Sequence, residues 1–237
     1  KFEFIIFHPR HHSIDPHDYP ITINDSTFTP SPCVRNLGVN QDQCLSMEKH
    51  VSSIIKSCYH QIRSIGRIRD CITTDACRSL VQSTVTSRLD YCNALLHNLP
   101  KLLLRRLQLV QNTCARLVTC TKRRDSISPV LKELHWLPVE YRAKYKVLLY
   151  TYKAMHGLAP QYICDLIEVY VPARPLRSAS QSLLKVPKSR TATYGSRSFR
   201  ASAPQLWNQL PEHVKQAPTL VSFNRLLKTC LFREAHN

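Results

Sequence analysis

A change in the spacing of apolar residues near residue 45 constrains the fold more than any other feature of this sequence. Before that point, short apolar runs alternate with prolines, and from Leu45 onward apolar side chains recur every three or four residues. The second spacing matches the period of an α-helix and places the apolar residues on one face. The sequence therefore predicts a mainly α protein that begins with a small β element.

The first 40 residues are expected to form strands and turns. FEFIIF (Phe2–Phe7) has the composition of a buried strand, and shorter strands are expected in ITIN (21–24) and VRNLGV (34–39). The intervals between them contain prolines, which interrupt regular structure.

Residues 41–121 predict a bundle of three helices. The first runs from about Met47 to Arg69 with Ser46 as its N-cap, the second follows Thr74, and the third begins at Pro100. Short connections between amphipathic helices favour a compact bundle. The residues expected to face inward are Val51, Ile54, Ile55, Cys58, Ile62 and Ile65, then Cys77, Leu80, Val81, Thr84, Val85 and Leu89, and finally Leu103, Leu107, Val110, Cys114, Leu117 and Val118.

Residues 122–237 predict a helical and irregular basic region. We expect a short helix near Pro129, a longer one that ends at Gly157, a short segment in 160–168 and a final helix over 220–232. Residues 169–211 contain no Asp or Glu and are rich in Ser and Pro, so we expect them to be irregular or weakly stranded. The predicted organisation is thus 1–40, 41–121 and 122–237.

The net charge of +17 indicates a polyanionic partner. Up to residue 120 there are 14 basic and 9 acidic residues, and after it 19 and 7. Such an excess opposes compaction through self-repulsion unless an anion compensates it. No apolar run approaches the length of a membrane-spanning helix, so we expect no membrane partner.

Catalytic and metal-binding motifs are absent from the sequence. Four glycines leave no Walker A loop, no GxGxxG and no GxSxG, and there is no Asp-Asp doublet to hold two metal ions. We therefore expect no enzymatic activity, no small-molecule substrate and no cofactor in this chain. The ten cysteines include no CxxC pair, which argues against structural zinc and favours a reduced intracellular location, in cytoplasm or nucleus rather than secreted.

One metal alternative stays open at the N-terminus. Histidines cluster near Asp15 and Asp18, and together with Cys33 or Cys44 they could ligate a transition metal. The clustered histidines are His8, His11, His12 and His17. A surface turn is the interpretation that we favour.

Cations interleaved with aromatic residues are the candidate nucleic-acid contacts. Guanidinium groups fork onto phosphates, and aromatic rings stack on unpaired bases. Trp136 and Trp207 lie beside prolines and are expected to be core residues, with base stacking as the alternative. The candidates after the bundle are Lys122, Arg123 and Arg124, followed by Arg174, Arg177, Lys185, Lys188, Arg190, Tyr194, Arg197, Phe199 and Arg200.

Five blocks, in this order, resemble the C-terminal part of reverse transcriptases from non-LTR (LINE-type) retrotransposons. They are SRLDYCNALLHNLP (87–100), RLQLVQNTCARLV (106–118), LHWLPVEYR (134–142), TYKAMHGLAPQY (151–162) and APQLWNQLP (203–211). In addition, NLGV (36–39) resembles the strand that leads out of the family's palm, and KFEFIIF resembles a palm strand that usually begins Lys-Thr-Glu.

The resemblance implies a fragment of an RNA-directed DNA polymerase. Residues 1–40 would be the end of the palm, 41–121 the thumb and 122–237 a C-terminal extension, with the catalytic aspartates and their Mg²⁺ upstream. Lys1 would correspond to a palm lysine, although Phe2 replaces the usual Thr. The thumb of this family holds the RNA/DNA template–primer by its backbone, and Arg63, Arg67 and Arg69 are the implied contacts on the first helix.

Two other interpretations remain compatible with the sequence. A helical protein-interaction module could present its basic face to an acidic protein, and a degenerate copy of a transposable element would carry the same residues without a function.

Overall fold

The computed structural model describes residues 3–9, 15, 18–172, 182–191 and 195–236, and these are mainly helical with a small N-terminal β element. The chain divides into two compact units, 1–57 and 58–237. The boundary expected after residue 40 lies inside the first unit, and the one expected after residue 121 lies inside the second. None of the helices in the described ranges has the length and apolar character that a membrane crossing requires.

The first unit contains two separate antiparallel hairpins. Strands β1 (Ile21–Ile23) and β2 (Ser26–Phe28) are joined by Asn24 and Asp25, both with positive φ. Strands β3 (Cys33–Asn36) and β4 (Val39–Asp42) are joined by Leu37 and Gly38, which also have positive φ. Such two-residue turns are typical of tight hairpins. The single strand expected over 34–39 is therefore a hairpin with its turn at Leu37-Gly38.

The strand expected at Phe2–Phe7 is wrong for the described residues 3–7. This segment is irregular, and its backbone makes isolated hydrogen bonds, from Ser31 N–H to Phe4 O (2.8 Å) and from His8 N–H to Gln43 O (3.1 Å). Each hairpin pairs within itself, so no neighbouring strand extends the ladder to this run. Apolar composition indicates a strand only when a partner strand is present.

Asp42 starts the first helix, α1 (Glu48–Arg67). Its carboxylate accepts hydrogen bonds from Ser46 N–H and Met47 N–H, each 2.8 Å long, while Ser46 Oγ accepts one from Glu48 N–H at 3.3 Å. The hydrogen bond expected from Ser46 as a cap is present, and Asp42 fixes the turn that leads into the helix.

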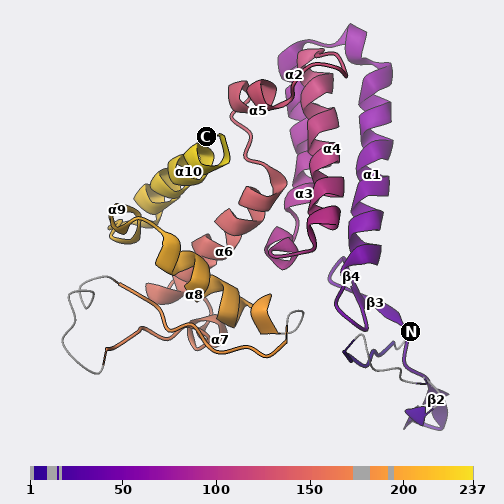
Figure 1. Ribbon diagram of the computed structural model, residues 1–237. Helices are drawn as coiled ribbons and strands as arrows, with labels where there is room; N and C mark the ends of the chain where they lie inside the picture. Colours follow the sequence, from indigo (N-terminus) through magenta and orange to yellow (C-terminus); the bar gives the residue numbers. More distant parts are fainter. Residues whose placement is uncertain (1–2, 10–14, 16–17, 173–181, 192–194, 237) are drawn as a thin grey trace. The chain divides into compact units, whose positions relative to one another are not determined.

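The helices expected from the apolar period form one part of the second unit. They are the end of α1, the turn η2 (Arg69–Cys71), α2 (Thr74–Val81), the π-helical η3 (Gln82–Thr86), α3 (Ser87–Asp90), the turn η4 (Asn93–Leu96) and α4 (Lys101–Thr119). Figure 1 shows α2 against α4, and α3 continues the run of α2 through η3.

A π-helical segment interrupts the second predicted helix. The buried residues Cys77, Val81, Val85 and Leu89 follow one another at intervals of four. On a regular α-helix each such step drifts about 40° around the axis. The wider turn of η3 offsets this drift, so that all four side chains stay in the core.

The second part of this unit packs around three aromatic side chains. Its helices are α5 (Ser128–Glu133), α6 (Val139–Met155), α7 (Gln161–Cys164), α8 (Phe199–Gln209), α9 (Glu212–Lys215) and α10 (Leu220–His236). The ring of Phe223 lies 4.2 Å from that of Tyr152 and 6.0 Å from that of Trp207, and α6 lies against α8 and α10 (Figure 1).

The expectation that residues 169–211 are irregular or weakly stranded is wrong for α8. Ala203, Leu206 and Trp207 are buried on one face of this helix, against α6. Burial of that face stabilises a helix which the Ser- and Pro-rich composition did not suggest. Residues 182–191 do remain largely irregular, with one isolated bridge between Leu184 and Val169.

Candidate nucleic-acid interface

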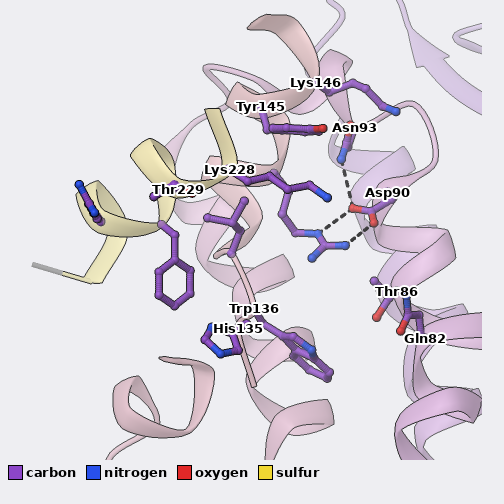
Figure 2. Close-up of a pocket in the computed structure, with 14 residues that line it drawn as sticks. Gln82, Thr86, Asp90, Asn93, His135, Trp136, Tyr145, Lys146, Lys228 and Thr229 are labelled. Carbon is purple, nitrogen blue, oxygen red and sulfur yellow. Dashed lines mark hydrogen bonds and ion pairs between the residues drawn. The ribbon is translucent and has the colours of Figure 1, made fainter. Parts of the chain in front are cut away.

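A groove of about 730 Å³ lies within the second unit (Figure 2). One wall comes from η3, α3 and the start of η4, the other comes from α10, and α6 with the preceding loop closes the groove between them. The lining residues are Gln82, Thr86, Asp90, Asn93, His135, Trp136, Leu137, Arg142, Tyr145, Lys146, Lys228, Thr229, Phe232 and Arg233.

Two glutamines on α4 fix the loop that carries Trp136. Gln111 Nε2 donates to Leu137 O at 2.9 Å, and Gln108 Oε1 accepts from Val139 N–H, the first residue of α6, at 2.9 Å. Because Pro138 precedes α6, no side chain caps the helix locally, and Gln108 supplies the missing acceptor. These bonds join α4 to α6 across the boundary expected after residue 121.

An ion pair spans the groove between α6 and α3. Arg142 donates from Nε to Asp90 Oδ1 at 2.7 Å and from Nη2 to Asp90 Oδ2. Asn93 Nδ2 donates to the same Oδ1 at 3.2 Å. Figure 2 shows these contacts as dashed lines that converge on Asp90. The only carboxylate of the lining is therefore already compensated.

Aromatic and polar contacts hold α10 in place as the second wall. The ring of Phe232 on α10 lies 5.5 Å from that of His135, in the loop before α6. Tyr145 donates from its hydroxyl to Asn224 Oδ1 at 3.0 Å, and burial raises the pKa of Tyr145.

Three cations of the groove keep their charge uncompensated. Among the described residues, no carboxylate lies within ion-pair distance of Lys146, Lys228 or Arg233. Lys228 Nζ lies 5.9 Å from the centre of the Tyr145 ring. A net positive groove with half-buried aromatic residues suits an anionic ligand that has planar groups.

The comparisons with known proteins give no family. No protein-family model, curated protein or solved structure matches this chain. In the part of the chain that the structure describes, no group of three or more His, Cys, Asp or Glu is placed to hold a metal ion. Of the N-terminal histidines, His11, His12 and His17 lie outside the described residues, so the metal alternative at that site stays untested.

Lys185 and Arg200 are paired with an acid that lies just outside the acid-free segment. Lys185 Nζ is 2.8 Å and Arg200 Nη2 is 3.2 Å from the carboxylate of Glu168. The hydrogen bond from Lys185 and its charge lower the pKa of Glu168, and Arg200 acts in the same direction. The net positive charge of residues 169–211 is therefore partly compensated by Glu168, which lies just before them.

Arg69 binds main-chain carbonyls of its own unit. Its Nε donates to Leu117 O at 2.8 Å, and its Nη2 donates to Val118 O at 3.0 Å. A guanidinium group at the C-terminal end of α4 satisfies carbonyls that the helix leaves without partners. Arg63 and Arg67 are exposed on α1, so these two, unlike Arg69, present their side chains to solvent.

The loop after α4 presents Lys122, Arg123 and Arg124 outward. Arg116 donates to the carbonyls of Lys122 (3.3 Å), Arg123 (3.4 Å) and Asp125 (2.8 Å), which ties the loop to α4. The three side chains that we predicted to bind phosphate remain exposed.

The remaining predicted residues differ in their surroundings. Lys188 and Arg190 are exposed. Arg197 is half-buried and donates to Leu95 O at 3.5 Å, and Phe199 packs against the core of α6, α8 and α10. Lys1, Arg174, Arg177 and Tyr194 lie outside the described residues.

The two tryptophans have different environments. Trp207 is fully buried and donates from Nε1 to Ser182 O at 2.8 Å, which confirms it as a core residue. Trp136 is half-buried and lines the groove. The groove cations were missed in the sequence, although Arg142 and Lys146 lie four residues apart on one helix, a spacing that places them on the same face.

Proposed function

We propose that this chain is the C-terminal part of a non-LTR retrotransposon reverse transcriptase and that it binds RNA or an RNA/DNA hybrid through the phosphate backbone. The order of the five blocks supports the family, and the uncompensated cations support the activity. With no Asp-Asp doublet in its sequence, the chain holds nucleic acid and does not extend it.

The observation that carries the binding proposal is the mismatch between cations and carboxylates. There are 33 Lys and Arg against 16 Asp and Glu, and in the second unit exposed cations occur at Arg63 and Arg67 of α1, in the loop after α4 and in the groove. Spread over one unit, these charges favour a polyanion without sequence preference, since phosphates present the same charge at every nucleotide.

The five blocks also supply contacts that hold the second unit together. Asp90 of the first block pairs with Arg142 of the third, and Gln111 of the second binds Leu137 of the third. Tyr152 and Trp207, from the fourth and fifth blocks, are core residues. A resemblance in these blocks is thus a resemblance in residues that determine the fold.

Fluorescence anisotropy of a labelled RNA/DNA hybrid tests the proposal. Each lost phosphate contact should reduce the slope of log affinity against log salt by about 0.9. The triple variant Lys122→Gln, Arg123→Gln, Arg124→Gln should lower that slope by about 3 and weaken binding.

A variant with the same charge loss is the control. This triple variant replaces three exposed cations of the first unit, Arg35→Gln, Lys49→Gln and Lys56→Gln. It should change the salt slope less than the variant in the loop after α4 does. Equal effects of the two triple variants would show a diffuse field and refute the assignment of contacts. A native chain with a salt-independent affinity, or none at low salt, would contradict nucleic-acid binding and favour an acidic protein partner.

A further inference from the structure

We infer that the groove beside Trp136 binds a single-stranded segment of nucleic acid, with an unpaired base stacked on the Trp136 ring and its phosphates on Lys146 and Lys228. This inference rests on the proposed nucleic-acid binding and names the form of nucleic acid that this site accepts.

The main chain at Trp136 is held in position by contacts within the chain. The backbone N–H of Trp136 donates to Leu131 O at 2.9 Å, and His236 Nε2 contacts the backbone carbonyl of Trp136 at 3.4 Å. Figure 2 shows Trp136 next to His135 on the side of the groove that faces Gln82 and Thr86. A half-buried indole on a fixed backbone offers a stacking surface for a base.

The cations line the same groove as Trp136 and are available. Lys146 belongs to α6, while Lys228 and Arg233 belong to α10, and none of the three has an ion-pair partner among the described residues. Arg142, the fourth cation, is occupied by Asp90. A base on the indole and phosphates on the lysines match the two features of a single-strand binding site.

The wall opposite α10 contains an unsatisfied acceptor. Asn93 is 4% exposed, its Nδ2 donates to Asp90, and its Oδ1 has no hydrogen-bond partner. A buried acceptor without a donor is costly, so a ligand that offers an N–H or O–H group would be favoured there. Unpaired bases provide such donors, whereas bases inside a duplex have their pairing edges occupied.

Intrinsic tryptophan fluorescence distinguishes stacking from charge attraction. The chain has two tryptophans, and Trp207 is fully buried, so a ligand that stacks in the groove should quench the emission of Trp136. We expect quenching by a twelve-nucleotide oligo(U) and none by an abasic oligomer with the same number of phosphates.

Variants at position 136 provide the affinity readout, measured by anisotropy. Trp136→Phe keeps an aromatic ring and should bind nearly as the native chain does, but without the emission change. Trp136→Leu should bind oligo(U) about tenfold more weakly. A thermal melt of each variant checks that it is folded.

The lysines are tested by the salt dependence of oligo(U) binding. The double variant Lys146→Gln/Lys228→Gln should lower the slope of log affinity against log salt by about 1.4, since each single-strand phosphate contact contributes about 0.7. The control Lys101→Gln, Lys132→Gln removes the same charge from exposed positions outside the groove and should leave the slope unchanged.

The outcomes separate this inference from the proposed function. Quenching by the abasic oligomer, or an unchanged affinity in Trp136→Leu, would overturn the stacking site. Binding of a fully paired hybrid without binding of oligo(U) would overturn it too and leave the proposed function intact. Failure of every nucleic acid to bind at low salt would overturn both.

Discussion

His97, which follows η4, is a half-buried histidine with an unsatisfied ring nitrogen. Its Nδ1 has no hydrogen-bond partner, and burial together with the positive charges of Lys144 and Arg197 lowers its pKa to about 4. The folded chain therefore holds this ring neutral at neutral pH. Arg197 contributes to this depression, which makes it part of the local structure as well as a predicted phosphate contact.

The free energy of unfolding should decrease as the pH is lowered, because His97 is held neutral in the folded chain. The unfolded chain, with an ordinary histidine pKa near 6.5, binds the proton before the folded chain does, so stability is complete above about pH 6.5 and declines as pH falls toward 4. From pH 7.5 to pH 5 the expected loss is about 2 kcal/mol. Urea unfolding at the two pH values measures it.

The variant His97→Gln should lose this part of the pH dependence. The control His60→Gln replaces an exposed histidine on α1 and should keep the dependence of the native chain. If His97→Gln and the native chain lost the same stability on acidification, the burial of a neutral His97 would be contradicted.

At the level of elements, the Arg142–Asp90 pair connects α6 to α3 with a bidentate geometry. The two side chains are 20% and 37% exposed, and Asn93 also donates to the carboxylate. A double-mutant cycle with Arg142→Ala and Asp90→Ala should give a coupling of about 1 kcal/mol by urea unfolding. The more exposed Lys185–Glu168 pair is the matched control and should couple less. A reversed order would show that the bidentate contact does not fix the two helices.

The apolar face of α4 is tested by truncation. Leu107 is fully buried, and Leu107→Ala should cost about 2–5 kcal/mol of unfolding free energy because it leaves a cavity. Leu102 on the same helix is 70% exposed, and Leu102→Ala should cost less than about 0.5 kcal/mol. Similar costs at both positions would mean that α4 does not pack by the face described.

For the whole molecule, the expected chemistry is binding without polymerisation. A purified preparation should show no primer extension with Mg²⁺ and nucleotides, because the sequence lacks the carboxylate doublet that holds two metal ions. A primer-extension assay measures this, with an active reverse transcriptase as the positive control. Incorporation by the purified chain would reveal an active site that the sequence motifs did not indicate.

Much of the helical framework could be predicted from the sequence, since it depends on local patterns. Period, capping residues and prolines lie within a few positions of the helices that they define, as at Ser46, whose hydroxyl accepts from Glu48 N–H at 3.3 Å. The unpaired run at 3–7 and helix α8 were not predictable in this way. A strand needs a partner, and α8 is stabilised by a face that packs on α6.

The candidate site depends on tertiary structure more than the helical framework does. The charge of +17 and the excess of cations after residue 120 are properties of the sequence, and they indicate a polyanion before any fold is known. Which cations remain available depends on neighbours distant in sequence: Glu168 pairs with Arg200, Asp90 pairs with Arg142, and the α4 carbonyls bind Arg69. Composition determines the total charge, but only the folded chain determines which charges are compensated, because ion pairs form between side chains that the fold brings together.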